Sequence, residues 1–531
     1  MYPIIALLAA VTAVYLVLSS YLTRRRHARL AAEWGCQPPI RRRSKWPGGF
    51  DFVWEIIKAD RTNDLVNLFE DVAKEMSPRT HTWLQAFAGA TVINTLEPKN
   101  VQAILATQFK DFEFGSVRQG CFYQMFGYGI FSDNGERWEH SRALLRPQFA
   151  RANIADLDSL ERHLQHFMRH FQVDSSGWTQ QIDLAPMFFR LSLDGATEFL
   201  FGESVDSQLL ALPGYEHELT RGDHQSLNTI NFSTAFDTGM AYVATKFRIN
   251  DLHWMYNPPE FLRSIKEVHR FADYFVRKAL DSTKSSAGQE KELEGGHKKG
   301  RYVFAEELAQ ATRDPVEMRN QLLHILLAGR DTTAGLLGAI FYRLAENPAI
   351  YQKLRQAVVN DFGTYEHPKN MDFAELKACS YLQYVLNEGL RLHPSVPANG
   401  RCAVRDTTLP VGGGPDGKSP VFVKKGQEVS YSVHNIQRRK DLFGEDAEEF
   451  VPERWIDRKA GWEFVPFNGG PRICLGQQYA LTTAGYVVAR LVQRFDQLGD
   501  LESHGPRYKH AYTVTVAPAT AKMRLHEASA H

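Results

Sequence analysis

A short segment near the C-terminus surrounds one of the five cysteines with residues that favour an ionised thiol. It reads FNGGPRICLG over residues 467–476, with the cysteine at position 474. Glycines on both sides let backbone amides approach the sulfur, where their hydrogen bonds stabilise an anion. The helical pattern of residues 477–492 would bring the positive end of a helix to the same sulfur and lower the pKa of the thiol. The segment therefore predicts a thiolate metal ligand, with a buried structural cysteine as the alternative.

Two polar residues interrupt a stretch that is predicted to form a buried helix. Residues 321–327 (QLLHILL) are apolar nearly all round, and Asp331 and Thr332 follow within the same helical pattern. Burying a carboxyl and a hydroxyl costs free energy, so we expect a functional reason for them. The structural alternative is a threonine bonded to the carbonyl four residues earlier and an aspartate paired with a neighbour.

Three pairs of residues at helical spacing could interact on one face of a helix. Glu388 and Arg391 are three residues apart on an apolar stretch, where a buried charge needs a buried partner. The same spacing at Glu267 and Arg270 is interpreted as a solvated surface pair. Residues 138 and 142, a tryptophan and an arginine, are four apart on one predicted helical face.

Segment 467–476 matches every specified position of the haem-binding signature FxxGxRxCxG, and with it the chain resembles the cytochrome P-450 superfamily. Four longer stretches resemble the fungal family that hydroxylates n-alkanes and fatty acids: residues 35–39, 129–149, 328–337 and 467–481. The resemblance implies the cytochrome P-450 fold, a mostly α-helical haem-binding domain with minor β-sheets. It also implies haem b as cofactor.

The resemblance implies a role for each motif residue. Cys474 would be the axial thiolate ligand of the haem iron, and Asp331 and Thr332 would deliver protons for dioxygen activation. Glu388 and Arg391, together with Arg454, would form an ionic lock that supports the haem loop. The residues implied to bind the haem or its propionates are Trp138, Arg142, Arg401, Arg472, Phe467, Gly470 and Gly476.

The resemblance also implies an activity and partners. Members of the fungal family are anchored in the endoplasmic reticulum and hydroxylate the terminal carbon of alkanes or fatty acids. They use O2 and electrons from NADPH–cytochrome P-450 reductase. Hydroxylation of another lipophilic or secondary metabolite is the alternative. A haem-thiolate isomerase or dehydratase, or a non-enzymatic haem or scaffold protein, would have no need of Asp331 and Thr332. Substrate contacts are implied for residues 113–131, 232–256, 326–327, 396–399 and 513–516.

A phosphate-binding pattern points to a different class of protein. Residues 412–419 (GGGPDGKS) match GxxxxGK[ST], which binds phosphate only between a buried strand and a helix. Pro410 precedes the pattern, and Pro420 with the strand-like residues 421–423 follows it. We therefore predict a glycine-rich hairpin tip, and we reject an ATPase.

Composition excludes several further classes. The formal net charge of +1 gives no sign of a nucleic-acid partner. The cysteine count is odd, the spacings are long and no CxxC pair occurs. This argues against a disulfide framework and against a zinc site, which needs several clustered ligands, and it favours a reducing compartment.

The N-terminus predicts a membrane anchor. Residues 3–22 contain no charged residue, and a helix of this length spans roughly 30 Å, the thickness of a bilayer's hydrocarbon core. Four arginines follow between residues 24 and 29, so the positive-inside rule places the rest of the chain in the cytosol. A cleaved signal peptide is the alternative.

The predicted domain plan has three parts: an anchor at 1–22, a basic Pro/Gly-containing linker at 23–50 and one catalytic domain at 51–531. Helical periodicity dominates from about 55 to 395, with strand-like segments near 91–96, 420–423 and 428–433. The polar, glycine-rich residues 282–301 are predicted to form a surface loop.

Overall fold

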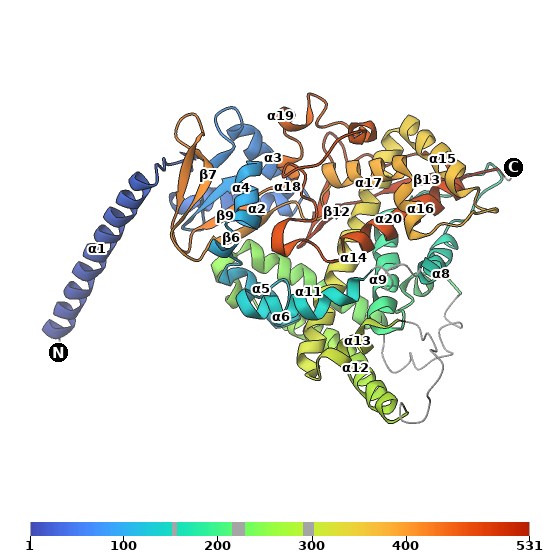
Figure 1. Ribbon diagram of the computed structural model, residues 1–531, viewed down its shortest axis with the longest axis horizontal. Coiled ribbons are helices and arrows are strands. Elements are labelled where there is room, and N and C mark those ends of the chain that lie inside the picture. Colours follow the sequence, from blue (N-terminus) through green and yellow to red (C-terminus); the bar gives the residue numbers. More distant parts are fainter. Residues whose placement is uncertain (1, 151–156, 215–228, 290–301, 530–531) are drawn as a thin grey trace.

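One long helix, α14 (Pro315–Glu346), runs through the middle of the protein (Figure 1). Asp314 caps it by accepting hydrogen bonds from the backbone N–H groups of Val316 and Glu317. Most side chains between Met318 and Leu344 are buried, because neighbouring helices pack on several sides of α14. The predicted buried helix is therefore confirmed, and its polar residues do lie inside the protein.

This computed structural model describes residues 2–150, 157–214, 229–289 and 302–529. The longer helices that surround α14 or extend the body are α2 (Phe50–Asp60), α3 (Leu65–Met76), α5 (Ser116–Phe126), α6 (Gly135–Leu145), α8 (Leu157–Met168), α9 (Leu184–Phe201), α11 (Thr229–Arg248), α12 (Pro259–Gln289), α13 (Phe304–Ala311), α15 (Pro348–Phe362), α17 (Ser380–Leu392) and α20 (Gln477–Arg494). Shorter helices are α4 (Pro98–Gln102), α10 (Ser207–Leu210), α16 (Phe373–Ala378), α18 (Val433–Ile436) and α19 (Lys440–Phe443). The mostly helical prediction is confirmed.

The strands form small sheets, of which the largest lies on the side nearest the N-terminal helix (Figure 1). Its order is β1 (Ile40–Arg41), β2 (Thr82–Phe87), β3 (Ala90–Thr95), β9 (Glu428–Tyr431), β6 (Asn399–Ala403) and β4 (Phe112–Glu113). A second sheet joins β10 (Phe495–Gly499), β13 (Lys522–Glu527) and β5 (Ile182–Asp183), and β11 (His510–Tyr512) pairs with β12 (Val516–Pro518). On β6, Arg401 lies opposite Val429 of β9 and is buried, which brings a charged side chain into the interior.

The phosphate-loop pattern is the tip of a β-hairpin, as predicted. Strands β7 (Thr407–Gly413) and β8 (Ser419–Val423) pair antiparallel on either side of it. Gly412 has φ +109°, and a Cβ atom there would come within 2.4 Å of Thr82. The N–H of Gly414 donates to the carbonyl of Pro38 at 3.1 Å. The glycines thus allow a close approach to neighbouring chain, and no helix follows to bind phosphate.

Two predicted boundaries are wrong. The N-terminal helix α1 (Tyr2–Glu33) continues past residue 22, so the first part of the predicted linker is helical. Its basic segment is rich in Arg, Ala and Leu, which are strong helix formers, and the end of the apolar stretch does not end the helix. Helix α12 likewise continues to Gln289 through the first part of the predicted loop 282–301, while residues 290–301 lie outside the described residues.

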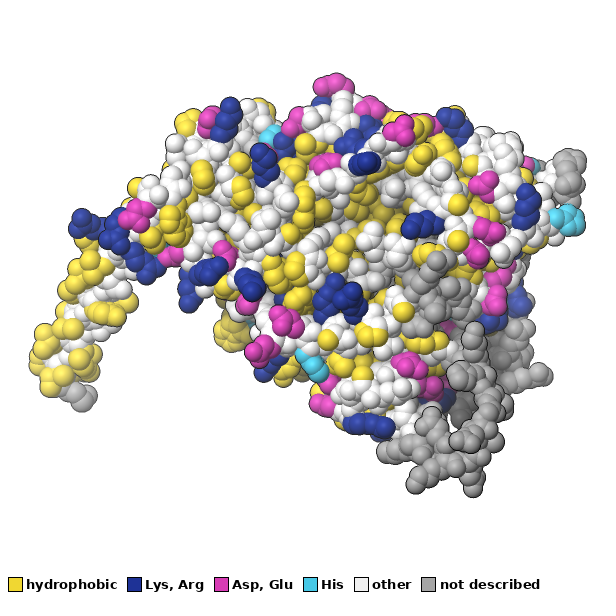
Figure 2. Space-filling view, in the orientation of Figure 1, with side chains coloured by type: hydrophobic (Ala, Val, Ile, Leu, Met, Phe, Trp, Pro, Cys, Tyr) yellow, Lys and Arg dark blue, Asp and Glu magenta, His cyan; other side chains and the backbone are white. Residues whose placement is uncertain are grey.

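Helix α1 has the length and composition needed to cross a membrane, and none of its residues is buried in the protein. Figure 2 shows hydrophobic side chains along the projecting helix and Lys and Arg side chains where it meets the body. At that junction the guanidinium of Arg26 pairs with the carboxylate of Asp406.

Candidate active site

Cys474 lies in a loop that leads from a short 3-10 turn, Gly470–Arg472, to the N-terminus of α20. Its backbone N–H donates to the carbonyl of Phe467 at 3.0 Å, which folds the loop back on itself. Gly470 has φ +63°, and a Cβ atom there would lie 1.9 Å from the carbonyl oxygen of Leu105. Only glycine fits this position, so the signature glycine has a steric as well as a conformational reason.

The pKa of the Cys474 thiol is raised, contrary to the expectation from the sequence. The residue is exposed, yet the protein packed around the sulfur desolvates it, and this outweighs the stabilising effects of the Gly476 amide and the Arg142 charge. The helix end and the glycines therefore do not ionise the thiol by themselves. A coordinated metal cation does so, because a coordinating thiol loses its proton.

Three guanidinium groups meet around the ring of Phe114. The guanidinium carbons of Arg118, Arg401 and Arg472 lie 4.0, 4.2 and 4.3 Å from the ring centroid. Arg118 comes from α5, Arg401 from β6 and Arg472 from the loop of Cys474. Burial, together with repulsion from the other two arginines, lowers the pKa of Arg472 to about 9. Burial and the charge of Arg401 lower the pKa of Arg118 to about 9 as well.

This group of three, the arginine cluster, has donors that the protein leaves unused. Arg401 Nη2 and Arg472 Nη1 are buried and have no hydrogen-bond partner in the described parts of the chain. The other donors bond neutral acceptors: Arg401 Nη1 reaches Asn399 Oδ1 at 3.0 Å, and Arg472 Nη2 reaches the carbonyl of Asp133 at 3.0 Å. Unneutralised buried cations are unfavourable, so the cluster fits a ligand with carboxylate groups, such as the propionates of a haem.

The other two residues expected at the propionates, Trp138 and Arg142, lie outside the arginine cluster. Trp138 is buried on α6, and the Arg472 guanidinium lies 4.2 Å from its ring centroid. Arg142 Nη1 donates to the carbonyl of Ile473 at 3.1 Å, so this arginine contacts the loop of Cys474 instead of joining the cluster. Arg118 is a member of the cluster that sequence reasoning missed. The only signal was that it is the one basic residue in the segment 113–131.

Arg391 and Arg454 both pair with Glu388, in the arrangement expected of the ionic lock. Arg391 and Glu388 are both fully buried on α17 and make a bidentate pair, with Nε–Oε2 and Nη2–Oε1 distances of 2.8 Å each. Arg391 Nη1 and Nη2 also donate to the carbonyls of Gln437, Ala447 and Glu449. Arg454 joins with its Nε 3.5 Å from Glu388 Oε1. The lock therefore holds α17 against the chain segment that leads to the Cys474 loop.

Two further residues complete the lock and were not predicted. Trp455 donates its indole N–H to Glu388 Oε2 at 3.0 Å. Gln437 donates its amide to the carbonyls of Leu390 and Arg391 and accepts from the N–H of Val465 at 3.1 Å. Trp455 follows Arg454 in the sequence, which could have indicated it, whereas Gln437 stands in no recognisable pattern.

Asp331 and Thr332 lie near the middle of α14. The Thr332 hydroxyl donates to the carbonyl of Ala328 at 2.6 Å, and Asp331 Oδ1 lies 3.2 Å from Arg330 Nη1. Burial raises the pKa of Asp331 to about 6, although the Arg330 charge opposes this. Both contacts also belong to the structural alternative, so they do not by themselves assign proton delivery.

The face of α14 that carries Thr332 is different from the rest of the helix. Ala328, Gly329 and Thr332 are partly exposed, whereas the residues on either side of them are buried. Positions i, i+1 and i+4 share one helical face, so this open face of α14 is less covered by protein than the rest of the helix. Asp331 is buried on a neighbouring face. Arg330 pairs with it and also with Asp237, whose Oδ1 lies 2.6 Å from Arg330 Nη2.

A loop thiol, a buried group of cations without an anion and a central helix with an accessible threonine together define the site of a haem-thiolate protein. The family model described as Cytochrome P450 matches residues 45–523. Cytochrome P450 monooxygenase g430 of Fusarium sp is 47% identical over 496 residues, 92% of this chain and 84% of its own length. Cytochrome P450 52A12 of Debaryomyces hansenii is 43% identical over 501 residues, 92% of each chain.

Cytochrome P450 monooxygenase alt2 of Alternaria solani is also similar, with 42% identity over 507 residues, 92% of this chain and 91% of its own length. The chain therefore belongs to the cytochrome P450 family. It is a monooxygenase that binds haem through a cysteine thiolate, and it needs dioxygen, a substrate and a redox partner.

Proposed function

We propose that this enzyme hydroxylates long-chain fatty acids or n-alkanes, at the terminal carbon, with electrons from NADPH delivered by NADPH–cytochrome P-450 reductase. The observation that carries the substrate class is the extent of the likeness to Cytochrome P450 52A12. It covers 92% of each chain and so includes the segments between the haem motifs. The resemblance of residues 129–149 and 328–337 to fungal alkane and fatty-acid hydroxylases supports the same assignment.

The proposed roles of the site residues follow from their positions. Cys474 would supply the thiolate that holds the haem, and the arginine cluster would hold its propionates with the unused Nη atoms. The haem, when bound, supplies dioxygen activation, which a thiolate ligand promotes by donating electron density. The ionic lock fixes the loop that carries Cys474, so its role is structural.

We assign proton delivery to Thr332 and Asp331. Thr332 exposes its side chain on the open face of α14, and its hydroxyl can exchange the Ala328 carbonyl for another partner. Asp331, with its pKa raised to about 6, can both release and regain a proton near neutral pH. The neighbouring Arg330 holds its carboxylate through an ion pair of 3.2 Å.

Aromatic side chains support a hydrocarbon substrate. The two longest segments implied to contact substrate meet through ring pairs, Phe122 with Phe247 at 5.4 Å and Phe126 with Phe236 at 6.2 Å between centroids. His324 of α14 lies among these rings, and burial lowers its pKa to about 4, so it stays uncharged. Aromatic rings and an uncharged imidazole at this position suit contact with an alkyl chain.

Helix α1 is the proposed anchor in the endoplasmic reticulum membrane, with the catalytic domain, residues 51–531, on the cytosolic side. Arg24, Arg25 and Arg26 lie at the end of its apolar stretch and favour the cytosolic face. The pairing of Arg26 with Asp406 ties the helix to the catalytic domain near the membrane surface.

The test is a reconstituted reaction. The purified protein, the reductase and NADPH are supplied with fatty acids from laurate to oleate and with n-alkanes, and products are identified by mass spectrometry. We expect hydroxylation at the chain end. A protein that binds carbon monoxide as a haem-thiolate enzyme but oxidises none of these lipids would contradict the substrate class. It would instead favour another lipophilic or secondary metabolite as the substrate.

Proton delivery has its own test. Thr332→Ala removes the hydroxyl from the open face of α14, so NADPH consumption should continue while electrons pass to hydrogen peroxide in place of product. The measured quantities are NADPH, peroxide and hydroxylated product in the same reaction. Thr333→Ala, in which the neighbouring buried hydroxyl is removed, is the matched control. Normal coupling in Thr332→Ala would contradict the assignment.

A further inference from the structure

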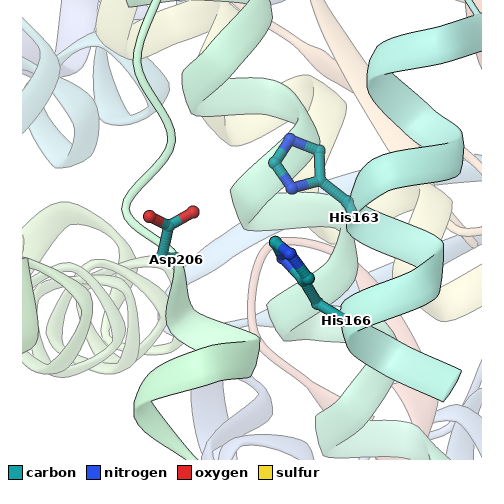
Figure 3. Close-up of side chains that lie close together, drawn as sticks. All are labelled: His163, His166 and Asp206. Carbon is teal, nitrogen blue, oxygen red and sulfur yellow. The ribbon is translucent and has the colours of Figure 1, made fainter. Parts of the chain in front are cut away.

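A group of potential metal ligands lies away from the haem site, between α8 and the start of α10. His163 and His166 are three residues apart on α8, and Asp206 precedes α10. One ligand atom of each lies within 4.8 Å of those of the other two. Figure 3 shows the two imidazole rings one above the other on α8, with the carboxylate of Asp206 facing them across a gap.

Within the described parts of the chain, one ring nitrogen of His163 is hydrogen-bonded and the other is not. Its Nε2 bonds the carboxylate of Glu198 on α9, while its Nδ1 is buried and has no hydrogen-bond partner in the described residues. His163 is only 3% exposed, so water does not readily serve this atom. A neutral imidazole that donates Nε2–H to a carboxylate presents a lone pair at Nδ1, which is the arrangement of metal-ligating histidines and their supporting carboxylates.

Glu198 is itself held in place by several side chains. Its carboxylate accepts hydrogen bonds from the Ser159 hydroxyl and the Arg162 guanidinium as well as from His163. Arg162 Nη2 lies 2.8 Å from Glu198 Oε1. The supporting carboxylate is thus preformed, and it orients the His163 ring before any ion binds.

We propose that His163, His166 and Asp206 bind a divalent transition-metal ion, of which Zn²⁺ is the best fit. Two imidazoles and one carboxylate form a common donor set for Zn²⁺, whereas Ca²⁺ and Mg²⁺ prefer oxygen ligands throughout. His166 and Asp206 are only partly buried, which leaves room for water as the fourth ligand.

Binding of a metal ion requires the three ligand atoms to move slightly closer together. Ligand atoms about 2.1 Å from a tetrahedral metal lie roughly 3.4 Å from one another. The present spread of up to 4.8 Å must therefore shrink by about 1.4 Å at most, which rotation of the Asp206 and His166 side chains can supply. Asp206 is available for this, because its carboxylate does not cap α10. The ion would tie α8 to the connection between α9 and α10 and stabilise both.

The test measures metal content and not catalysis. The full-length holoprotein is treated with a chelator, dialysed against Zn²⁺, and its zinc and iron are counted by mass spectrometry, with affinity obtained by competition against a chromophoric chelator. We expect one Zn²⁺ per haem and a higher melting temperature with zinc. His166→Ala and Asp206→Asn should each weaken binding by about 100-fold, and Glu198→Gln by about 10–100-fold.

His367→Ala removes an exposed histidine elsewhere and serves as the matched control, which should bind zinc like the wild type. His166 and Asp206 are chosen for substitution because they are only partly buried, and an unchanged haem spectrum confirms that the variants are folded. Zinc binding that is equally tight in wild type and in a His166→Ala, Asp206→Asn double variant would overturn the proposal, as would no uptake by the wild type.

Discussion

Two groups of arginines in the interior of this enzyme differ in how completely their guanidinium groups are paired. In the ionic lock, Arg391 is fully buried, and its Nε, Nη1 and Nη2 atoms all have partners, among them the carboxylate of Glu388. In the arginine cluster, Arg118, Arg401 and Arg472 repel one another, and two of their Nη atoms have no partner in the described residues. The first group is complete within the chain, and the second is not.

The contrast shows which buried charges serve the fold and which serve a ligand. Arg391 is neutralised and fully hydrogen-bonded, so it has no donor left for a ligand. Its contacts instead stabilise the loop that holds Cys474. A cluster of cations with unused donors lowers the stability of the ligand-free protein. Binding of an anion restores that stability. The lock and the cluster should therefore respond differently to loss of charge.

The largest effect is expected in the lock. Glu388→Gln removes the carboxylate and leaves Arg391 buried without a counter-charge, which typically costs about 3–5 kcal/mol. This is a large part of the stability of a typical protein, so we expect a low yield of haem-containing protein and a strongly reduced melting temperature. The melting temperature and the haem content of the soluble fraction are the measurements.

A matched control uses the same spacing in a solvated setting. Glu267 and Arg270 are also three residues apart, with an Nη2–Oε2 distance of 2.7 Å, but both side chains are substantially exposed. Glu267→Gln should change the free energy of unfolding by no more than about 1 kcal/mol. Equal effects of the two substitutions would mean that burial of the lock is not what makes it important.

A smaller effect of a different kind is expected in the cluster. Arg401→Gln relieves repulsion, so the haem-free protein should be as stable as the wild type or more stable, while the haem should dissociate about 10–100-fold faster for loss of one charge-assisted hydrogen bond. Haem loss is followed by transfer to an excess of a haem-scavenging apoglobin, and apoprotein stability by thermal denaturation.

Arg405→Gln is the control for the cluster, because Arg405 lies close by in the sequence but is largely exposed and pairs with Asp111. It should leave the rate of haem loss unchanged. A less stable apoprotein with unchanged haem retention in Arg401→Gln would place Arg401 with the lock and remove the distinction between the two groups.

The third expected effect, at Asp331, appears only as a dependence of stability on pH, and Arg330 partly compensates it. The folded-state pKa of Asp331 is raised from 3.8 to about 6, so the folded protein keeps this proton over a pH range in which the unfolded chain releases it. The free energy of unfolding contributed by Asp331 is therefore highest below pH 4 and falls as the pH rises through about 6, by about 3 kcal/mol at most.

Asp331→Asn should remove this dependence. Melting temperatures of wild type and variant, measured between pH 4 and 8, should diverge in favour of the variant as the pH rises. A difference that does not change with pH would show that the carboxyl is not perturbed in the way its burial predicts. In that case the argument for Asp331 as a proton donor near neutral pH would be lost.

Local motifs carry most of what the sequence could predict. The residues around Cys474 and the pair Glu388 and Arg391 depend on neighbours within ten positions, so their arrangement can be derived from helix geometry and glycine conformations. The buried course of α14 follows from its nearly continuous apolar pattern. The rejected phosphate loop could be judged from its neighbours as well, because Pro420 and the residues after it form a strand.

Features that depend on distant segments could not be predicted. Arg118, Arg401 and Arg472 come from a helix, a strand and a loop that only the folded chain brings to one ring. The raised pKa of Cys474 also depends on packing that no local pattern reveals. The full length of α1 was missed for a different reason, since the loss of apolar character after residue 22 does not end the helix.

The central claim, that Cys474 is the thiolate ligand, has a direct test. The purified protein is reduced under carbon monoxide, and its absorption is compared with that of Cys474→Ser and of Cys36→Ser as a control. We predict the red-shifted Soret band of a thiolate-ligated haem in the wild type and in Cys36→Ser, and its loss in Cys474→Ser. A wild-type protein without that band, or a Cys474→Ser variant that keeps it, would contradict the assignment.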